Sequence, residues 1–340
     1  MASARGYRGG MRIAVLFGGS SEERDVSIAS AAPVVRALRG LGHEVLAVDT
    51  ASGALDAAAE ARVLTGAVGA APPESSALAR LAGAGSALRL PAEVAGVDLV
   101  FLALHGGSGE NGELQALLQL AGIPYTGSGP LGSGLAMDKE LTKRVLLQAG
   151  VRTPDWSLDP LEPAAAAARL GLPVVVKPNA QGSTVGLTIV RDPDELDAAV
   201  DRAAVFGSVL LERFVPGREL TVGVLGDEAL AVGEIGIDPD SAFGYGDKYQ
   251  PGAVSETFPA DLPAEVAAEA RAAALTAHRA LRLSGYSRTD FRLDRDGVLW
   301  TIEVNSLPGL TATSLLPQSA AAVGIGYAEL CRRICDLALG

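Results

Sequence analysis

The chain has 340 residues, a length that predicts two or three domains rather than one small core. Hydrophobic residues make up 48% of it, so we expect the chain to fold. Its net charge of -12 argues against a nucleic-acid partner, because such a surface needs a basic stripe. No stretch approaches the roughly 20 apolar residues of a membrane span. Cys331 and Cys335 are the two cysteines and are expected to be small core residues. This cysteine poverty suggests a reducing compartment, so the cytoplasm is the expected location, without a membrane partner.

The first third of the chain alternates strand and helix patterns. An apolar strand with a glycine turn (12–19) is followed by helical spacing (26–42) and a second strand (43–49). A third strand runs from residue 97 into the glycine-rich loop "HGGSGENG", and a helix ends at Gly122. This order predicts a doubly wound parallel α/β domain over residues 1–127.

The remainder predicts two mixed α+β units. The first spans residues 128–215, opens with one helix over 133–151 and continues with short strands, among them "LPVVVKP" and "SVLLERFV". The second spans residues 216–340 and contains hairpin-like strands, among them "YSRTDFRLD" and "LWTIEVN", with a long alanine-rich helix and a C-terminal helix.

Gly127, Gly129 and Gly132 form a G-x-G-x-x-G pattern, which is typical of dinucleotide-binding turns. The preceding strand is weak, Pro130 lies inside the turn, and no acidic residue ends a following strand at the expected distance. We therefore interpret the pattern as a loop between domains.

The stretch "VVVKPNAQGSTVGL" is compatible with a phosphate-binding loop and equally with a hairpin that has an exposed lysine. Lys177 ends an apolar strand, where its charge is costly without an anion. The following loop has hydroxyl groups and glycines, including Ser183, and such loops close over phosphates. In "MDKELTKRVL", Lys139 can reach the same phosphates, whereas Lys143 is interpreted as part of a solvated helix face.

Two pairs of polar residues point to a nucleotide and a metal. Glu212 and Glu219 flank a short apolar linker that could hold a nucleoside, although exposed glutamates are common. In "RTDF" and "EVN", strand alternation puts residues two apart on the same face. If the two strands are antiparallel neighbours, Asp290, Glu303 and Asn305 form a set of hard oxygen ligands for Mg²⁺. Arg288 beside them could stabilise a transferring phosphoryl group.

These motifs together resemble the ATP-grasp superfamily and, within it, the D-alanine–D-alanine ligase family. The resemblance covers about residues 12–336. It is carried by eight segments in order: "VLFGGSSEERDVS", "ALHGGSGENGELQ", "GIPYTGSG", "MDK", "VVVKPNAQGSTVG", "DKY", "RTDF" and "EVNSLPGLTATSL". It implies an ATP-grasp fold and ATP-dependent joining of two D-alanines through an acyl phosphate, for peptidoglycan precursor synthesis. It also implies two Mg²⁺ ions, with Mn²⁺ as a substitute, and a homodimer.

The resemblance further implies a role for each matching residue. The residues expected to bind ATP are Lys139, Lys177, Ser183, Glu212, Glu219 and Lys248. Those expected to be catalytic are Glu23, Ser183, Tyr249, Arg288, Gly309 and Ser314, with the Gly309 N–H and Arg288 forming an oxyanion hole. Substrate binding is expected at Glu23, His105, Ser314 and Leu315, and metal binding at Asp290, Glu303 and Asn305.

Three alternatives stay open at the level of sequence. A related ligase could use D-lactate or D-serine as acceptor, differing around Tyr249, Ser314 and Leu315; the presence of Tyr249 favours the amide product by resemblance. An oxidoreductase built on the glycine pattern would change a cofactor's absorbance without using ATP. A regulatory nucleotide-binding module would tolerate the loss of Arg288.

Overall fold

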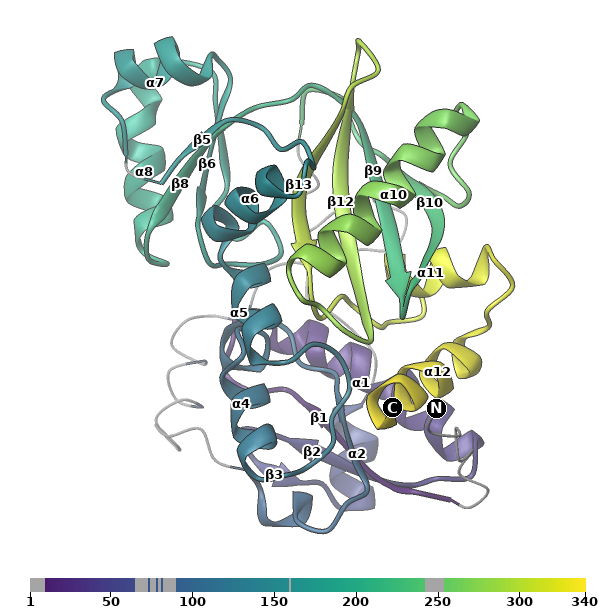
Figure 1. The fold of residues 1–340 in the computed structure, drawn as a ribbon. Helices are drawn as coiled ribbons and strands as arrows, with labels where there is room; N and C mark the ends of the chain where they lie inside the picture. The colour runs from purple at the N-terminus through teal and green to yellow at the C-terminus, as the bar shows by residue number, and fades with distance from the viewer. Residues whose placement is uncertain are drawn as a thin grey trace.

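Three sheets organise the chain in a computed structural model that describes residues 10–64, 90–158, 160–241 and 254–340, together with 73, 78 and 81. The N-terminal sheet lies below the other two in Figure 1. The central sheet and the large sheet stand side by side above it. The strands of each sheet fall within one of the predicted ranges 1–127, 128–215 and 216–340, and we keep these limits as a proposal.

The N-terminal sheet has the strand order β3-β2-β1-β4. Strands β1 (Arg12–Phe17), β2 (Glu44–Asp49) and β4 (Leu99–Leu102) are parallel, and β3 (Gly53–Ala54) runs antiparallel to β2. Five consecutive residues of β1 are buried, as expected for a strand covered on both faces. The helical segments of this part are α1 (Arg24–Gly40), α2 (Ala57–Val63), η1 (Ala92–Val94), η2 (Gly107–Gly109) and α4 (Glu113–Leu120). The predicted parallel α/β domain is confirmed.

The central sheet is antiparallel, with the order β5-β8-β6-β7. Its strands are β5 (Trp156–Ser157), β6 (Val174–Pro178), β7 (Thr188–Val190) and β8 (Val209–Arg213). Helices α7 (Pro163–Leu170) and α8 (Leu196–Ala204) pack on it through a small apolar core, and the short η3 (Pro193–Glu195) precedes α8.

The large sheet is also antiparallel, with the order β11-β10-β9-β12-β13. Its strands are β9 (Gly217–Leu225), β10 (Glu228–Gly236), β11 (Ser255–Thr257), β12 (Tyr286–Asp294) and β13 (Leu299–Asn305). Helix α10 (Ala264–Ala280) crosses this sheet (Figure 1) and packs its alanines against β9 and β12.

Two helices occupy the region where one was predicted. Helix α5 (Pro130–Met137) ends at Asp138, whose backbone is extended, and α6 (Lys139–Gln148) begins at the next residue. The Asp138 carboxylate accepts a hydrogen bond of 2.9 Å from the Leu141 N–H, which makes it the N-cap of α6. The prediction of one continuous helix over 133–151 was wrong because the capping aspartate competes with helix continuation.

The glycine pattern before this break forms the start of α5. Gly129 is the N-cap, Pro130 is the first helical residue and Gly132 is buried within the helix. A Cβ on Gly132 would lie 2.7 Å from the Arg282 carbonyl oxygen, so the glycine permits α5 to pack closely on the turn after α10. The prediction of an interdomain loop was therefore wrong for Pro130 onward.

The two C-terminal helices pack on different parts of the molecule. Helix α11 (Leu315–Ala321) packs on β9 and β10, whereas α12 (Tyr327–Leu339) lies against α1 (Figure 1). Leu330, Ile334 and the two free cysteines are buried in the core that includes β1 and β4. Cys331 and Cys335 are thus small core residues, as predicted. In the part of the chain that the structure describes, none of the helices is long and apolar enough to cross a membrane.

Candidate active site

Two adjoining cavities lie where the three sheets meet. The inter-sheet cavity, of about 810 Å³, is lined by β6, β8, β9, β12 and β13, and therefore lies between the central and large sheets. The junction cavity, of about 860 Å³, is lined by residues that include Glu23, His105, Arg288 and Ser314. Lys139, Gln181 and Glu303 line both cavities. A molecule in one cavity can therefore reach a molecule in the other near Lys139.

The inter-sheet cavity combines apolar walls with charged groups. Its apolar residues include Val175, Leu187, Phe214, Phe291 and Ile302. Its charged residues include Lys139, Lys177, Glu212, Glu219 and Glu303. Walls of this kind suit a flat heterocycle, and the lysines suit attached phosphates.

Three charged side chains form a buried cluster beside this cavity. The Lys177 ammonium lies 3.0 Å from one oxygen of Glu212, and the Lys143 ammonium lies 2.5 Å from the other. Lys143 is only 1% exposed and also donates to Thr153 Oγ1 and to the Pro154 carbonyl. The prediction that Lys143 lies on a solvated face was wrong, because α6 turns this residue inward toward β8.

Lys139 lies at the point where the cavities meet. It is the first residue of α6, and its ammonium donates to the Gln181 carbonyl at 2.5 Å. The same ammonium lies 4.0 Å from a Glu303 carboxylate oxygen. Lys139 and Lys177 both line the inter-sheet cavity, while their binding to the same phosphates stays a prediction.

The register of β12 and β13 brings four predicted residues together. Asp290 pairs with Glu303 and Arg288 pairs with Asn305 on these antiparallel neighbours. A bulge lies between Asp290 and Phe291, so that Ile302 and Glu303 both line the inter-sheet cavity although they are consecutive. The expected clustering of the two strands' polar residues is confirmed.

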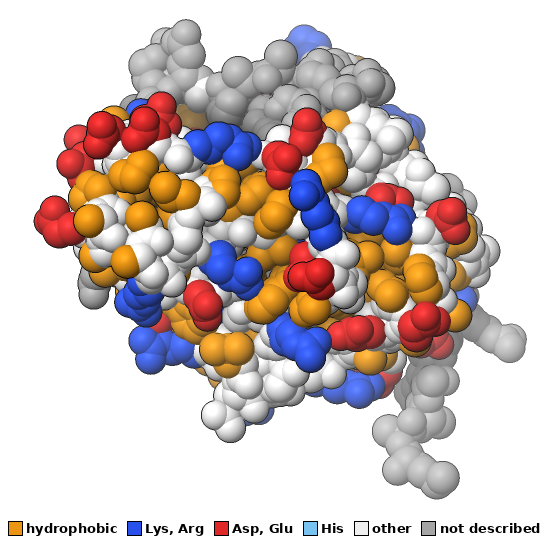
Figure 2. Space-filling view, turned by 90° about the horizontal axis from the view of Figure 1, so that it is seen from above, with side chains coloured by type: hydrophobic (Ala, Val, Ile, Leu, Met, Phe, Trp, Pro, Cys, Tyr) orange, Lys and Arg blue, Asp and Glu red, His pale blue; other side chains and the backbone are white. Residues whose placement is uncertain are grey.

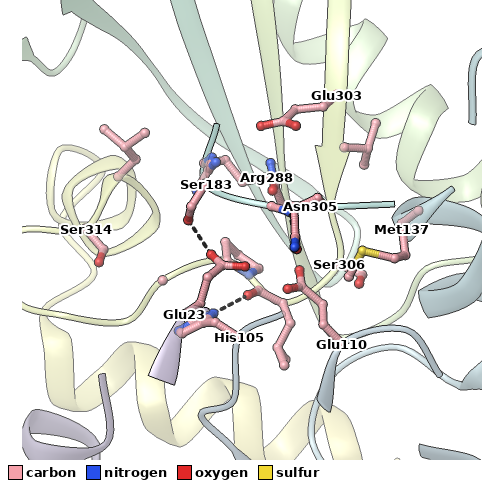
Figure 3. A pocket seen from close by; sticks show the side chains of 18 of the residues that line it. Glu23, His105, Glu110, Met137, Ser183, Arg288, Glu303, Asn305, Ser306 and Ser314 are labelled. Atoms are coloured by element: carbon pink, nitrogen blue, oxygen red, sulfur yellow. Dashed lines mark hydrogen bonds between the residues drawn. The ribbon is translucent and has the colours of Figure 1, made fainter. Parts of the chain in front are cut away.

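Asp290 is the centre of this group. It accepts hydrogen bonds from Arg288 at 2.8 and 2.7 Å, from the Thr221 hydroxyl at 2.7 Å and from the Asn305 amide at 3.1 Å. These contacts fix the guanidinium of Arg288, which lines the junction cavity (Figure 3). Thr221 on β9 was not singled out in the sequence, because a buried threonine on a strand carries no distinctive signal.

The donor set of β12 and β13 is suited to a hard cation. Two carboxylates and one amide, on Asp290, Glu303 and Asn305, supply oxygen atoms of the kind that Mg²⁺ prefers. Among the described residues no group of three or more His, Cys, Asp or Glu side chains forms a metal site by itself. The oxygen donors of Asp290, Glu303 and Asn305 fit a hard cation by their chemistry.

Glu23 and Ser183 meet across the junction cavity. Ser183 donates a short hydrogen bond to the Glu23 carboxylate, although the residues are 160 positions apart (Figure 3). Ser183 and Thr184 have φ of 49° and 63°, a left-handed conformation that is uncommon outside glycine. Such strain persists where the surroundings enforce it, often at binding sites. A Cβ on Gly182 would lie 2.4 Å from Glu23 Oε2, so a larger residue there would displace the Glu23 carboxylate.

His105 connects the end of β4 to the turn after β13. Its Nδ1 lies 3.1 Å from the Leu307 carbonyl and its Nε2 lies 3.0 Å from the Ser30 hydroxyl. A carbonyl only accepts, so Nδ1 carries the proton and the serine donates to Nε2. Burial lowers the pKa of His105 to about 4, so the ring is neutral at physiological pH. His105 lines the junction cavity but also holds the 307–310 turn.

Glu110 is a second carboxylate beside Glu23. It accepts a hydrogen bond of 2.9 Å from the Gly106 N–H and lines the junction cavity. Burial, together with the charge of Glu23, raises the pKa of Glu110 to about 8. Figure 3 shows both carboxylates at the edge of the cavity formed by the N-terminal loops.

Ser314 and Gly309 lie at the opposite side of the junction cavity. Ser314 is the N-cap residue of α11, and its hydroxyl accepts from the Thr311 N–H at 3.0 Å. A Cβ on Gly309 would lie 2.8 Å from Ser314 Oγ, so a larger residue there would displace this hydroxyl. Leu315 is buried and lines the cavity wall beside Ser314.

Glu219 lies at the other end of the site, on β9. Its carboxylate is 3.4 Å from the Arg292 guanidinium, and both residues line the inter-sheet cavity. Arg292, which sequence reasoning missed, is 5% exposed and donates to the Gly217 carbonyl. Lys248 and Tyr249, for which roles were predicted, lie outside the described residues.

Acidic and basic side chains are interspersed on the face that carries the two upper sheets (Figure 2). The concentration of lysines within the inter-sheet cavity is therefore a local feature and does not continue a basic surface on that face.

The fold and the cavities define an ATP-grasp ligase. The class follows from the N-terminal parallel domain and from the two antiparallel sheets, which enclose the inter-sheet cavity with its lysines.

Family models agree with this class. The model described as D-ala D-ala ligase N-terminus matches residues 12–128, and that described as D-ala D-ala ligase C-terminus matches residues 145–336. The chain belongs to the D-alanine–D-alanine ligase family.

Relatives and solved structures agree along the whole chain. A D-alanine–D-alanine ligase of Nitratidesulfovibrio vulgaris is 41% identical, over 97% of this chain and 98% of its own. One of Oleidesulfovibrio alaskensis is 44% identical, over 97% of both chains. The crystal structure of the Bacillus anthracis enzyme has a TM-score of 0.74, and its complex with ATP a TM-score of 0.73, each at 32% identity over 97% of both chains.

Proposed function

We propose that this chain joins two D-alanine molecules into D-alanyl-D-alanine at the expense of ATP, for peptidoglycan precursor synthesis. The observation that carries the proposal is the meeting of the two cavities at Lys139 and Glu303. One cavity suits a nucleotide, and the other has charged groups for amino and carboxylate ends. A phosphoryl group can pass between them without leaving the protein.

ATP is assigned to the inter-sheet cavity. The adenine lies between the apolar walls, near Glu212, and Glu219 binds the ribose hydroxyls. Lys139 and Lys177 hold the phosphates, Ser183 contributes from the loop between the cavities, and Lys248 completes the set. The buried position of both described lysines strengthens their attraction to phosphate, because water screens them little.

The amino acids are assigned to the junction cavity. Glu23 binds the ammonium of the first D-alanine, with His105 nearby, and that molecule's carboxylate takes the γ-phosphoryl group from ATP. Ser314 and Leu315 bind the carboxylate end of the second molecule. Ser183 is hydrogen-bonded to Glu23, and the resemblance assigns Tyr249 to the same hydrogen-bonded chain.

The bond-forming step is the attack of the second amine on the acyl phosphate, which expels phosphate. Arg288 and the Gly309 N–H stabilise the oxyanion of the tetrahedral intermediate. The contacts between Arg288 and Asp290 support this role, because they orient the guanidinium without any contact from a substrate.

Two Mg²⁺ ions, or Mn²⁺ in their place, are assigned to Asp290, Glu303 and Asn305. Bound there, the cations would neutralise phosphate charge. We also propose that the enzyme is a cytoplasmic homodimer, in keeping with its use of ATP and with the resemblance of its sequence to the family.

The first experiment is to incubate the purified protein with Mg²⁺, ATP and D-alanine, and to follow phosphate release and product mass. Parallel mixtures contain L-alanine, or D-alanine with D-lactate or D-serine. Phosphate release matched by D-alanyl-D-alanine, with D-alanine alone, supports the proposal. A mixed product with D-lactate or D-serine would move the assignment to a ligase with a different acceptor. No phosphate release from any mixture would contradict the proposed reaction.

A further inference from the structure

Lys143 is a buried charged residue that the proposed reaction does not use. It lies one helical turn after Lys139 on α6, but it does not line either of the two main cavities. Its ammonium has Glu212, Thr153 and Pro154 as oxygen partners, and it lies 5.3 Å from the centre of the Trp156 ring. An ammonium with so many partners has one fixed position.

Glu212 connects Lys143 to the cavity. One carboxylate oxygen contacts Lys143 and the other contacts Lys177, which lines the inter-sheet cavity. Glu212 is 2% exposed and Lys177 is 4% exposed, so water screens neither contact strongly. The position of the Lys177 ammonium therefore depends on the Glu212 carboxylate. Lys143 contacts the other oxygen of this carboxylate and holds it in place.

The charges of the cluster make Lys143 important for the nucleotide. Two ammonium groups and one carboxylate leave one net positive charge at the cavity wall. Without Lys143, the carboxylate of Glu212 would cancel the charge of Lys177, and an anionic ligand would meet a neutral pair. The same carboxylate would also be free to draw Lys177 away from the cavity.

The protonation of the cluster agrees with this description. Burial alone would raise the pKa of Glu212, but the two ammonium groups lower it, so Glu212 is ionised. Burial lowers the pKa of Lys143 to about 8, while Glu212 opposes that shift. Lys143 is thus mostly charged at neutral pH.

We propose that Lys143 is a positioning residue of the nucleotide site, which binds Glu212 so that Lys177 keeps its place and its net charge toward the phosphates. The inference rests on the proposed binding of ATP in the inter-sheet cavity. A purely structural role for Lys143 would change stability without a specific effect on nucleotide affinity.

The test compares ADP binding by calorimetry, and KM for ATP, in the full-length wild type and in Lys143→Met. Arg144→Met is the matched control, because it removes one positive charge from the next residue of the same helix, where the side chain is 70% exposed. We expect Lys143→Met to weaken ADP binding by about tenfold or more, since one charge near phosphate is lost in a poorly screened site. Its KM for D-alanine should stay within about threefold and Arg144→Met should bind ADP within about twofold of wild type.

A charge-conserving variant separates charge from folding. Lys143→Arg keeps a cation opposite Glu212, so Lys177 keeps its net charge toward the cavity. We expect this variant to bind ADP within about threefold of wild type. A folded Lys143→Met that binds ADP as wild type does would overturn the inference. If Lys143→Met does not fold, Lys143→Gln replaces it, because its neutral amide can still donate to Thr153 and Pro154; a folded Lys143→Gln that binds ADP within about twofold of wild type would overturn the inference. ADP binding needs no turnover. The inference about Lys143 can therefore fail while the ligase reaction is confirmed, and it can hold while the ligase reaction is not observed.

Discussion

Asp290 holds the guanidinium of Arg288 in one orientation. Asp290 accepts from two of the guanidinium nitrogens, and Asp290 is itself held by Thr221 and Asn305. A fixed cation that faces a reacting carbonyl stabilises developing negative charge without the cost of reorganisation. In the proposed reaction, the contacts of Thr221 and Asn305 with Asp290 would act through Arg288.

Replacing Arg288 by methionine should lower kcat by about 10² to 10³, because the oxyanion loses its charged donor. ADP binding should stay within about threefold, since Arg288 lines the junction cavity rather than the inter-sheet cavity. Steady-state phosphate release and ADP calorimetry measure the two effects. A kcat within tenfold of wild type would exclude the assigned role.

His278 should make the protein less stable in acid. This α10 residue is 4% exposed and its Nδ1 lies 2.8 Å from the Ser287 hydroxyl. Burial lowers the pKa of His278 to about 4, against an ordinary value of 6.5. Between these values the unfolded chain binds a proton that the folded chain excludes, so stability falls as pH drops through this window. The full effect is about 3 kcal/mol.

Urea unfolding of wild type and His278→Gln at pH 7 and pH 4.5 tests this. The variant should lose less unfolding free energy between the two pH values, by roughly 2 kcal/mol. Equal losses in the two proteins would show that His278 does not contribute to acid sensitivity.

At the scale of elements, the packing of α5 positions Lys139. Helix α5 approaches the turn after α10 so closely that Gly132 leaves no room for a Cβ, and α6 follows directly after Asp138. Apolar residues of these two helices form one cluster with residues of α10 and β13. The element that carries Lys139 is therefore attached to the strand that carries Glu303.

Gly132→Ala should lower the free energy of unfolding by about 1 to 3 kcal/mol, because the methyl group would overlap the Arg282 carbonyl. Gly40→Ala is the matched control: it is also a helical glycine, and no atom lies within 4 Å of its added Cβ. The control should be neutral or stabilising by up to about 1 kcal/mol. Thermal or urea unfolding measures the change in unfolding free energy for both variants. If both variants were destabilised, or both stabilised, the packing argument would be contradicted.

At the scale of the whole molecule, the two ends of the chain share one core. Helix α12 packs on α1, and its buried side chains belong to the apolar cluster of β1 and β4. The last helix therefore stabilises the two loops that follow β1 and β4. The first loop carries Glu23 and the second carries His105.

Ile334→Ala should cost about 2 to 5 kcal/mol and should speed amide exchange in β1 and β4 more than in β9 and β12. Leu337→Ala is the control, because Leu337 lies on the same helix but is 43% exposed, and should cost less than about 1 kcal/mol. Faster exchange confined to the large sheet would contradict the shared core.

Local patterns were sufficient for most strands and for the polar residues of β12 and β13. The alternation of side chains predicted that Asp290 shares a face with Arg288, and Glu303 with Asn305, and strand pairing then brought the four together. The break at Asp138 was not predicted, because helix periodicity continues through it and only the cap hydrogen bond reveals the end.

The sequence by itself determined the class of fold, the family resemblance and most of the polar residues of the site, because these depend on periodicity and on motifs within short segments. Tertiary structure decided that Lys143 is buried against Glu212, that Ser183 reaches Glu23 and that α12 completes the N-terminal core. Each of these contacts joins residues far apart in the chain. Short-range patterns do not show such partners, because a lysine on a helix face has the same local sequence whether water or a carboxylate lies opposite it.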